Sequence, residues 1–383
     1  MSEEKLRVIS IAHTAVSRAA GRLRYAPLAG RDDLDVHLVV PQRWKQFGRE
    51  IIADPPADAG ITTHVMPILF SHAGPFSWYL HVYPGLHRLI RKVRPHVIHL
   101  WEEPWSLVAL QARWLKGDAG LVLEVDQNIL KRLPPPFETI RKSVLGATDH
   151  ILSRSSDATM VVEARGYSGP VSMIGYGVDD TVFTPHRSSG EKKDPAQFVL
   201  GYVGRLIEEK GIQDVLEAMA RTPVPVVLKL MGEGPYEAAL REKAAALGLS
   251  DRMQITGWDE PAKVAAFLRS LDALVLMTRT TPSVKEQFGR VIIEAQGCGV
   301  PVVGARSGAI PDVIGEGGWV TPERDPTALA SLIEAIHADP RDRQEKAAAA
   351  LENVRLRFTY DAIAGQLHDA WKAAAAGKRA AAV

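Results

Sequence analysis

Short apolar runs recur along this chain at intervals that leave room for a helix between one run and the next. In the first half they lie at residues 6–12, 36–40, 97–100, 121–125, 158–162 and 171–174. In the second half they lie at residues 198–203, 226–231, 253–256, 273–277 and 301–303. Continuous apolar runs of this length are typical of parallel strands that helices cover on both faces. The alternation therefore predicts an α/β protein with two doubly wound sheets.

A polar stretch separates the two sets of runs. Residues 184–197 contain two prolines and a Ser-Ser-Gly-Glu-Lys-Lys run, a composition typical of a linker. We therefore predict an N-terminal domain over residues 1–183 and a C-terminal domain over residues 198–359. Residues 360–383 begin with an amphipathic stretch, and we expect this last helix to cross back to the N-terminal domain before a frayed tail.

Composition excludes several classes of protein. The chain has 46 basic and 45 acidic residues, so its net charge of +1 gives no electrostatic reason to expect a nucleic-acid partner. Its one cysteine, Cys298, excludes an internal disulfide and a multi-cysteine metal site, and its small neighbours predict a packing role. No apolar run approaches the roughly 20 residues of a membrane span. Residues 1–5 are short and charged rather than a signal peptide, so we expect a cytoplasmic protein.

Two glutamates, Glu286 and Glu294, flank the point near Phe288-Gly289 where a loop is predicted to enter a helix. Backbone N–H groups at a helix start lack partners and attract anions. A carboxylate on each side of such an anion site could grip the hydroxyl groups of a nucleotide-sugar. The alternative is that the two glutamates only complement the helix dipole. The small-residue turn after the strand at 301–303 favours a ligand site, because open α/β sheets bind ligands at the carboxyl ends of their strands.

Glycines and cations follow other strands of the second half. The first strand there is followed by Gly204, and then by Arg205 and Lys210 before the next helix. Arg and Lys supply the donors that a diphosphate needs, although a solvated loop would carry the same residues. Gly232 and Gly257 follow two further strands, where they allow either the close approach of a ligand or a plain tight turn.

Four motifs follow one another through residues 198–315. They are Gly204-Arg205…Lys210-Gly211, Gly232-Glu233-Gly234-Pro235, Thr256-Gly257 and Glu286-Gln287-Phe288-Gly289…Glu294-Ala295. Their order resembles the retaining glycosyltransferases of family 4. The resemblance implies a GT-B fold, in which two Rossmann-like doubly wound domains face a central cleft. The first half shares the strand–helix rhythm and the exit Gly177-Val178-Asp179…Phe183-Thr184-Pro185.

The resemblance also implies roles for individual residues. Arg205 and Lys210 would hold the donor diphosphate and stabilise its leaving charge, Glu294 would bind the ribose, and Glu286 would contact the transferred sugar. The wider donor-binding set comprises Gly204, Gly232, Gly257, Phe288, Gly289, Arg290 and Val291, with backbone N–H groups from residues 288–290. Members of the family need neither a metal nor a cofactor, because the cations neutralise the diphosphate. The expected donor is a UDP-sugar in preference to a GDP-sugar, and the expected reaction retains the anomeric configuration.

The acceptor side departs from the family pattern. Many relatives have a glycine pair after the first strand, whereas this chain has only Gly21 there. Many also have a histidine after the fourth or fifth strand, where this chain has Asp126 and Gln127, so one of these would face the donor instead. His13 and His99 are other candidates at strand ends, and a structural role is the alternative for each.

Two further features bear on the acceptor. Residues 101–105, Trp-Glu-Glu-Pro-Trp, combine aromatic rings with carboxylates after a strand, which suits either carbohydrate recognition or a capped helix start. Residues 86–94 and 129–142 combine basic and apolar residues, as helices at a peripheral membrane contact do, with a solvated helix face as the alternative.

These features predict an enzyme that glycosylates a carbohydrate, a lipid-linked or a small-molecule acceptor in glycan, glycolipid or natural-product biosynthesis. The alternative is a non-catalytic relative that binds a nucleotide-sugar and serves as a partner or scaffold subunit, because the glycine pair and the histidine are missing.

Overall fold

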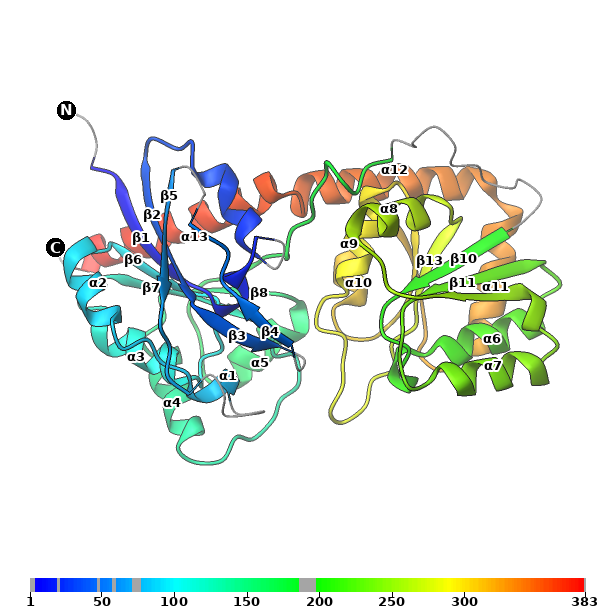
Figure 1. Cartoon of the computed structure of the whole chain (residues 1–383), viewed down its shortest axis with the longest axis horizontal. Helices are drawn as coiled ribbons and strands as arrows, with labels where there is room; N and C mark the ends of the chain where they lie inside the picture. Colours follow the sequence, from blue (N-terminus) through cyan, green and yellow to red (C-terminus); the bar gives the residue numbers. More distant parts are fainter. Residues whose placement is uncertain are drawn as a thin grey trace. The chain divides into compact units, whose positions relative to one another are not determined.

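The computed structural model describes residues 4–18, 21–46, 49–56, 60–70, 77–185 and 198–381. The chain forms two compact units, one comprising Met1–Tyr176 with Tyr360–Val383 and the other Gly177–Thr359. Both are drawn in Figure 1. The first unit ends at Tyr176, and not at residue 183, because the segment after Tyr176 packs with the second unit; the Val178 N–H, for example, donates to the Phe358 carbonyl at 2.8 Å. Residues 186–197 of the predicted linker lie outside the described residues.

The first unit is built on a seven-stranded parallel sheet with the order β5-β2-β1-β6-β7-β8-β9. Its strands are β1 (Leu6–Ile11), β2 (Leu34–Pro41), β5 (Ile61–Met66), β6 (Val97–Leu100), β7 (Gly120–Val125), β8 (His150–Ser153) and β9 (Val171–Met173). A short antiparallel pair, β3 (Arg43–Gln46) and β4 (Arg49–Ile52), follows β2. The strand order reverses between β1 and β6, and such a switch point leaves a crevice at the carboxyl ends of the strands.

Helices cover both faces of this sheet (Figure 1). They are η1 (His13–Val16), η2 (Arg22–Leu28), α1 (Ser77–Leu80), α2 (Leu86–Val93), α3 (Leu107–Leu115), α4 (Phe137–Leu145), α5 (Ser156–Ala164) and α13 (Tyr360–Ala381). One core contains α2, α3 and α4, and the other contains η2 and α13, which contributes Ile363, Leu367 and Trp371. The predicted last helix thus begins at Tyr360 and belongs to the first unit.

The strand predicted at residues 158–162 is wrong, because this segment lies within α5. The Ser155 side chain accepts a hydrogen bond from the Ala158 N–H at 3.2 Å, which caps the helix, and Met160 is exposed where a central strand would bury it. The strand at this place in the fold is β8, a four-residue segment that comes earlier in the chain.

The two segments considered for membrane contact, residues 86–94 and 129–142, do not form exposed amphipathic helices. Helix α2 buries its apolar side chains, Leu86, Leu89, Ile90 and Val93, in the core of the first unit. Residues 129–142 are not one helix, because α4 begins only at Phe137. Within the part of the chain that the structure describes, no helix combines the length and apolarity that crossing a membrane requires.

The second unit is built on a six-stranded parallel sheet with the order β12-β11-β10-β13-β14-β15. Its strands are β10 (Phe198–Val203), β11 (Val226–Met231), β12 (Met253–Thr256), β13 (Ala273–Leu276), β14 (Val302–Ala305) and β15 (Gly318–Thr321). The first five match predicted runs, and β15 has no counterpart among them. The switch point lies between β10 and β13.

The helical elements of the second unit alternate with these strands (Figure 1). They are η4 (Glu208–Lys210), α6 (Ile212–Arg221), α7 (Glu237–Ala246), η5 (Ser250–Arg252), α8 (Pro261–Arg269), α9 (Arg290–Gly297), α10 (Ile310–Ile314), α11 (Pro326–Ala338) and α12 (Pro340–Arg357). Both units are therefore doubly wound α/β structures, as the spacing of apolar runs predicts.

Candidate functional site

Backbone turns meet closely at the carboxyl ends of the second sheet. The Gly204 N–H, after β10, donates to the Met231 carbonyl at 3.0 Å, and the Gly232 N–H, after β11, donates to the Thr256 carbonyl at 2.9 Å. Gly204 and Gly232 both have φ +151°, a conformation open mainly to glycine. A Cβ at Gly232 would lie 1.9 Å from the Gly204 carbonyl oxygen. These glycines are therefore required for the turns to approach each other. Gly257 follows β12 at the next turn, where a Cβ would meet the Glu233 carboxylate at 3.2 Å.

An ion pair crosses the switch point of this sheet. Lys210 ends η4 in the connection after β10, and Glu286 lies in the connection after β13. The Lys210 Nζ lies 2.6 Å from the Glu286 Oε2, which also accepts a hydrogen bond from the Thr278 hydroxyl at 2.9 Å. Their side chains are 20% and 13% exposed. The structure thus brings together two predicted residues at the place where an open α/β sheet binds its ligand.

Arg205 lies near the start of the same connection, directly after Gly204, and its side chain is exposed. Its backbone carbonyl accepts a hydrogen bond from the Tyr202 hydroxyl at 2.8 Å. Burial, followed by the negative charge of Glu286, raises the pKa of Tyr202, so this phenol remains a neutral donor. The backbone that carries a second cation is therefore held just after β10, in the connection that also contains Lys210.

Helix α9 starts where the sequence predicts. It begins at Arg290 after Gly289, which has φ +79°, and Glu294 lies in its second turn. Burial raises the pKa of the half-buried Glu294 carboxyl, and the charge of Arg290 opposes this effect. The Phe288 ring packs against Phe358 in the core, so Phe288 can offer a ligand only its backbone. Val291 is half-buried in the first turn.

The loop that carries Glu286 is fastened at both ends. The Ala309 N–H, after β14, donates to the Glu286 carbonyl at 3.0 Å. At the start of the loop, the Arg279 guanidinium binds both carboxylate oxygens of Asp214 on α6, at 2.9 and 2.5 Å. Between them, the Thr280 N–H and hydroxyl each donate to the Glu323 carboxylate at 2.6 Å. The sequence marks none of these supporting residues, because their partners are distant along the chain.

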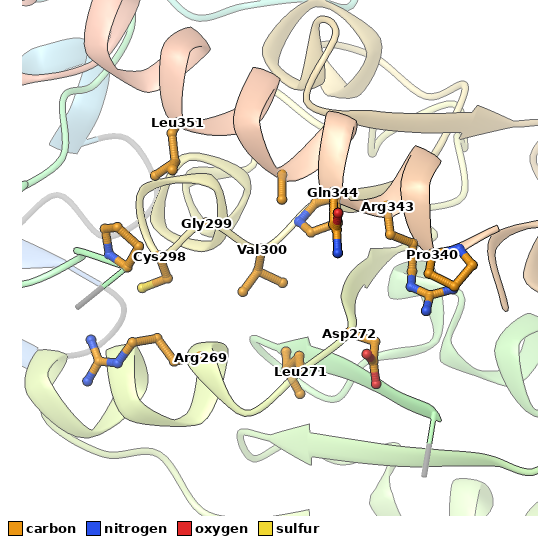
Figure 2. Close-up of a pocket in the computed structure, with 13 residues that line it drawn as sticks. Arg269, Leu271, Asp272, Cys298, Gly299, Val300, Pro340, Arg343, Gln344 and Leu351 are labelled. Carbon is orange, nitrogen blue, oxygen red and sulfur yellow. The ribbon is translucent and has the colours of Figure 1, made fainter. Parts of the chain in front are cut away.

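A separate cavity of about 440 Å³ lies in the second unit, and Figure 2 shows its lining residues. Asp272 and Pro301, which line it, come directly before β13 and β14, so it borders the amino ends of these strands. The donor residues follow the carboxyl ends, so this cavity is a different place. Cys298 is buried beside it, with Sγ 3.8 Å from the Ala265 carbonyl, in agreement with a packing role.

Comparison with known proteins places this geometry in a family. A model described as glycosyl transferases group 1 matches residues 184–355, and one described as glycosyltransferase family 4 matches residues 26–182. The chain belongs to the group 1 glycosyltransferases. The resemblance noted from its four motifs is confirmed.

Curated relatives of this glycosyltransferase family match part of the chain. N-acetyl-alpha-D-glucosaminyl L-malate synthase of Bacillus anthracis is 29% identical over 197 residues, covering 49% of this chain and 50% of that protein. D-inositol 3-phosphate glycosyltransferase of Corynebacterium diphtheriae is 30% identical over 223 residues, covering 54% and 51%. The chain thus spans about half the length of the curated relatives that it matches.

Solved glycosyltransferase structures match nearly the whole chain. A glycosyltransferase from Rickettsia africae superposes with a TM-score of 0.70 at 15% identity, over 97% of this chain and 99% of that one. HepE of Anabaena, solved with UDP and glucose, superposes with a TM-score of 0.66 at 18% identity, over 95% and 98%. At such identities the likeness concerns the fold alone, and that fold is GT-B.

In the first unit, a pair of side chains also crosses the switch point. His13 comes two residues after β1, and Glu102 comes two residues after β6. The Glu102 Oε1 accepts hydrogen bonds from the His13 backbone N–H at 3.1 Å and from its Nδ1 at 2.6 Å. The His81 Nε2 lies 3.5 Å from the same oxygen. Burial acts to raise the pKa of Glu102, but the charges of His13 and His81 outweigh it and lower the pKa to about 2.

The sequence suggests His99 as a candidate at a strand end, but the structure does not leave it open to a substrate. It lies inside β6, fully buried, with Nδ1 2.8 Å from the Ser10 hydroxyl and Nε2 3.1 Å from the Glu124 carboxylate. Burial lowers the pKa of His99, so the ring is a neutral part of the core. The glycine at position 21 also has a structural explanation, because a Cβ there would lie 2.9 Å from the Trp101 ring.

Asp126 follows β7, as predicted, but its carboxylate is engaged within the first unit. Its Oδ1 accepts hydrogen bonds from the Arg154 Nε at 2.9 Å and from the Tyr176 hydroxyl at 2.7 Å. Arg154 also pairs with the buried Glu124, as does Arg24, with Nη2 2.8 Å from the Glu124 Oε1. This network of buried charges is absent from the sequence predictions, because its members come from segments far apart in the chain.

Proposed function

We propose that this chain transfers a sugar from a nucleotide-diphosphate donor, a UDP-sugar in the first instance, to a carbohydrate, a lipid-linked or a small-molecule acceptor. The observation that carries the proposal is the Lys210–Glu286 pair at the switch point of the second sheet. Contact between these two side chains places an ammonium that can bind phosphate beside a carboxylate that can bind sugar hydroxyls.

Donor binding follows from the chemistry of these groups. An ammonium has three N–H donors, so Lys210 can keep its bond to Glu286 and still bind a phosphate oxygen. Thr278 donates to the same carboxylate oxygen and so orients the Glu286 carboxylate, which would accept from a sugar hydroxyl. Glu294, in the second turn of α9, would accept from the ribose hydroxyls. Arg205, in the same connection after β10, would also bind the diphosphate.

The reaction would break the bond between the anomeric carbon and the diphosphate oxygen. The bond electrons stay with the nucleoside diphosphate, whose growing negative charge Lys210 and Arg205 would stabilise without a metal ion at the donor site. The acceptor oxygen would form the new bond on the face that the diphosphate leaves, and its proton would pass to the departing phosphate oxygen. This course retains the anomeric configuration.

The base of the donor is proposed from fold neighbours. HepE of Anabaena has been solved with UDP, with UDP and glucose and with UDP-glucose. These structures support a UDP-sugar as the first donor to try.

The experiment is a panel of UDP-, GDP- and ADP-sugars, with nucleotide release measured without added Mg²⁺ or Mn²⁺ and binding measured by calorimetry. Lys210→Ala should lower turnover by about 10²–10³-fold, the usual loss when one charge-stabilising donor is removed. Lys263→Ala is the matched control, because Lys263 pairs with Asp259 at 3.1 Å on an exposed surface and should be dispensable. If no nucleotide-sugar binds, or if both variants behave alike, the proposal fails.

One observation favours the alternative of a non-catalytic relative. The Asp126 carboxylate is already bonded to Arg154 and Tyr176, so it does not supply a free group in place of the missing histidine. Tight UDP-sugar binding with no turnover on any acceptor, water included, would support a binding role. Turnover that is lost in Lys210→Ala would eliminate it.

A further inference from the structure

We propose that His13, His81 and Glu102 of the first unit bind one divalent transition-metal ion of the zinc class. One ring nitrogen from each histidine and one carboxylate oxygen lie within 4.8 Å of one another. Among the residues that the structure describes, these three form the one such group. The site belongs to a different unit from the donor residues, so the inference does not rest on the proposed transfer reaction.

The donor atoms have the composition and spacing that such an ion needs. Two imidazole nitrogens and one carboxylate oxygen are a common zinc ligand set, with a fourth position left for another ligand. Metal–ligand distances of about 2.0–2.1 Å place tetrahedral ligands roughly 3.3 Å apart. The Glu102 Oε1 lies 2.6 Å from the His13 Nδ1 and 3.5 Å from the His81 Nε2. Both distances lie within about 1 Å of the tetrahedral spacing.

The three side chains converge from separate segments at the switch point of the first sheet. His13 follows β1, His81 follows α1, and Glu102 follows β6. The His13 backbone N–H donates to Glu102 at 3.1 Å, and a contact of this kind orients a ligating carboxylate. A bound ion would join these three connections.

The surroundings explain why a cation is favoured there. The side chains of His13, His81 and Glu102 are 6%, 0% and 1% exposed. The Trp44 and Trp78 rings lie 4.4 and 4.9 Å from the His13 ring and enclose it. A buried carboxylate in such an enclosure is costly unless cationic or donor groups compensate its charge, and a metal ion at the three ligand atoms would do so.

The test uses the full chain, stripped with a chelator and titrated with Zn²⁺ alone, and the bound metal is counted by mass spectrometry after gel filtration. We expect about one zinc per chain, and Glu102→Gln should weaken binding by at least roughly ten-fold. His37→Ala is the matched control: the His37 and His64 rings also lie together, with Nδ1 and Nε2 2.9 Å apart, but they are not part of a metal-ligand group. This variant should bind zinc like the native chain.

Three results would overturn the proposal. One is a native chain that holds no zinc above background after stripping and reloading. The second is that the Glu102→Gln variant binds zinc as tightly as the native chain. The third is that the His37→Ala variant loses zinc to the same extent as the Glu102→Gln variant. If Glu102→Gln does not fold, Co²⁺ added to the native chain decides. Visible absorption bands that saturate at one equivalent and are displaced by Zn²⁺ support the site, and a featureless spectrum overturns it.

Discussion

Replacing Gly232 by alanine tests whether close backbone approach at the strand ends builds the donor site. The new Cβ would lie 1.9 Å from the Gly204 carbonyl oxygen, whereas ordinary contact begins at 3.4 Å, so one turn must move by 3.4 − 1.9 = 1.5 Å. That movement would strain the bond from the Gly232 N–H to the Thr256 carbonyl and displace the backbone next to Arg205.

Two costs add in this variant. A non-glycine residue at φ +151° costs about 1–3 kcal/mol, and a forced overlap in a packed region costs about 1–3 kcal/mol more. Gly248→Ala is the matched control, because Gly248 has φ +70° but nothing within 4 Å of its added Cβ. It should lose only the backbone term, about 1–2 kcal/mol. For a unit of this size, each kcal/mol lowers Tm by about 2–4 °C.

The assay pairs thermal unfolding with UDP calorimetry on the two variants and the native chain. Gly232→Ala should unfold at a lower temperature than Gly248→Ala, and its UDP Kd should rise at least about ten-fold, which is about 1.4 kcal/mol. Gly248→Ala should bind UDP like the native chain. Equal Tm values for the two variants would refute the steric reasoning, and native UDP affinity in Gly232→Ala would refute the link to the donor site.

Three other substitutions have defined outcomes. Glu294→Gln should raise Tm and weaken UDP binding. Because the folded-state pKa of Glu294 is raised, its ionised carboxylate destabilises the fold. The gain in Tm should therefore be present at neutral pH and shrink as pH falls below the raised pKa. Asp33→Asn should lower Tm, because hydrogen bonding from His368 on α13 holds the pKa of Asp33 well below its usual range. Because its pKa is depressed, the ionised Asp33 stabilises the folded chain at pH values above the unfolded-state pKa of about 3.9. The difference in Tm between the native chain and the variant should therefore narrow as pH is lowered from 5 to 3. Glu124→Gln should cost about 3–5 kcal/mol in urea unfolding, because it leaves Arg154 buried without its main counter-charge, and a loss below 1 kcal/mol would contradict the buried-pair assignment.

The sequence predicts the sheets well because buried parallel strands must be apolar throughout. The runs at residues 97–100, 198–203, 226–231 and 253–256 match strand bounds. It fails at residues 158–162, because Thr159, Val161 and Val162 favour strands while the cap at Ser155 favours a helix. Local pattern alone does not reveal which of these effects prevails.

The site could be predicted in its residues but not in its contacts. Lys210 and Glu286 lie 76 positions apart, and His13 and Glu102 lie 89 apart, so each contact depends on which strands become neighbours. Strand order is a property of the whole sheet, and no local pattern contains it. The roles implied for Lys210 and Glu286 came from the family resemblance, and the structure supplies the contact between their side chains.

The first unit is discontinuous in sequence, and this has a consequence for synthesis on the ribosome. One face of its sheet is covered by Ile363, Leu367 and Trp371 of α13, which are translated after the whole of the second unit. Domains usually fold in the order in which they emerge. Here the first unit to emerge is the last that can complete its core, and Val122 and Leu152 stay without their final cover while residues 177–359 are made. A message that ends before residue 360 would therefore release a finished second unit joined to an open, aggregation-prone first one.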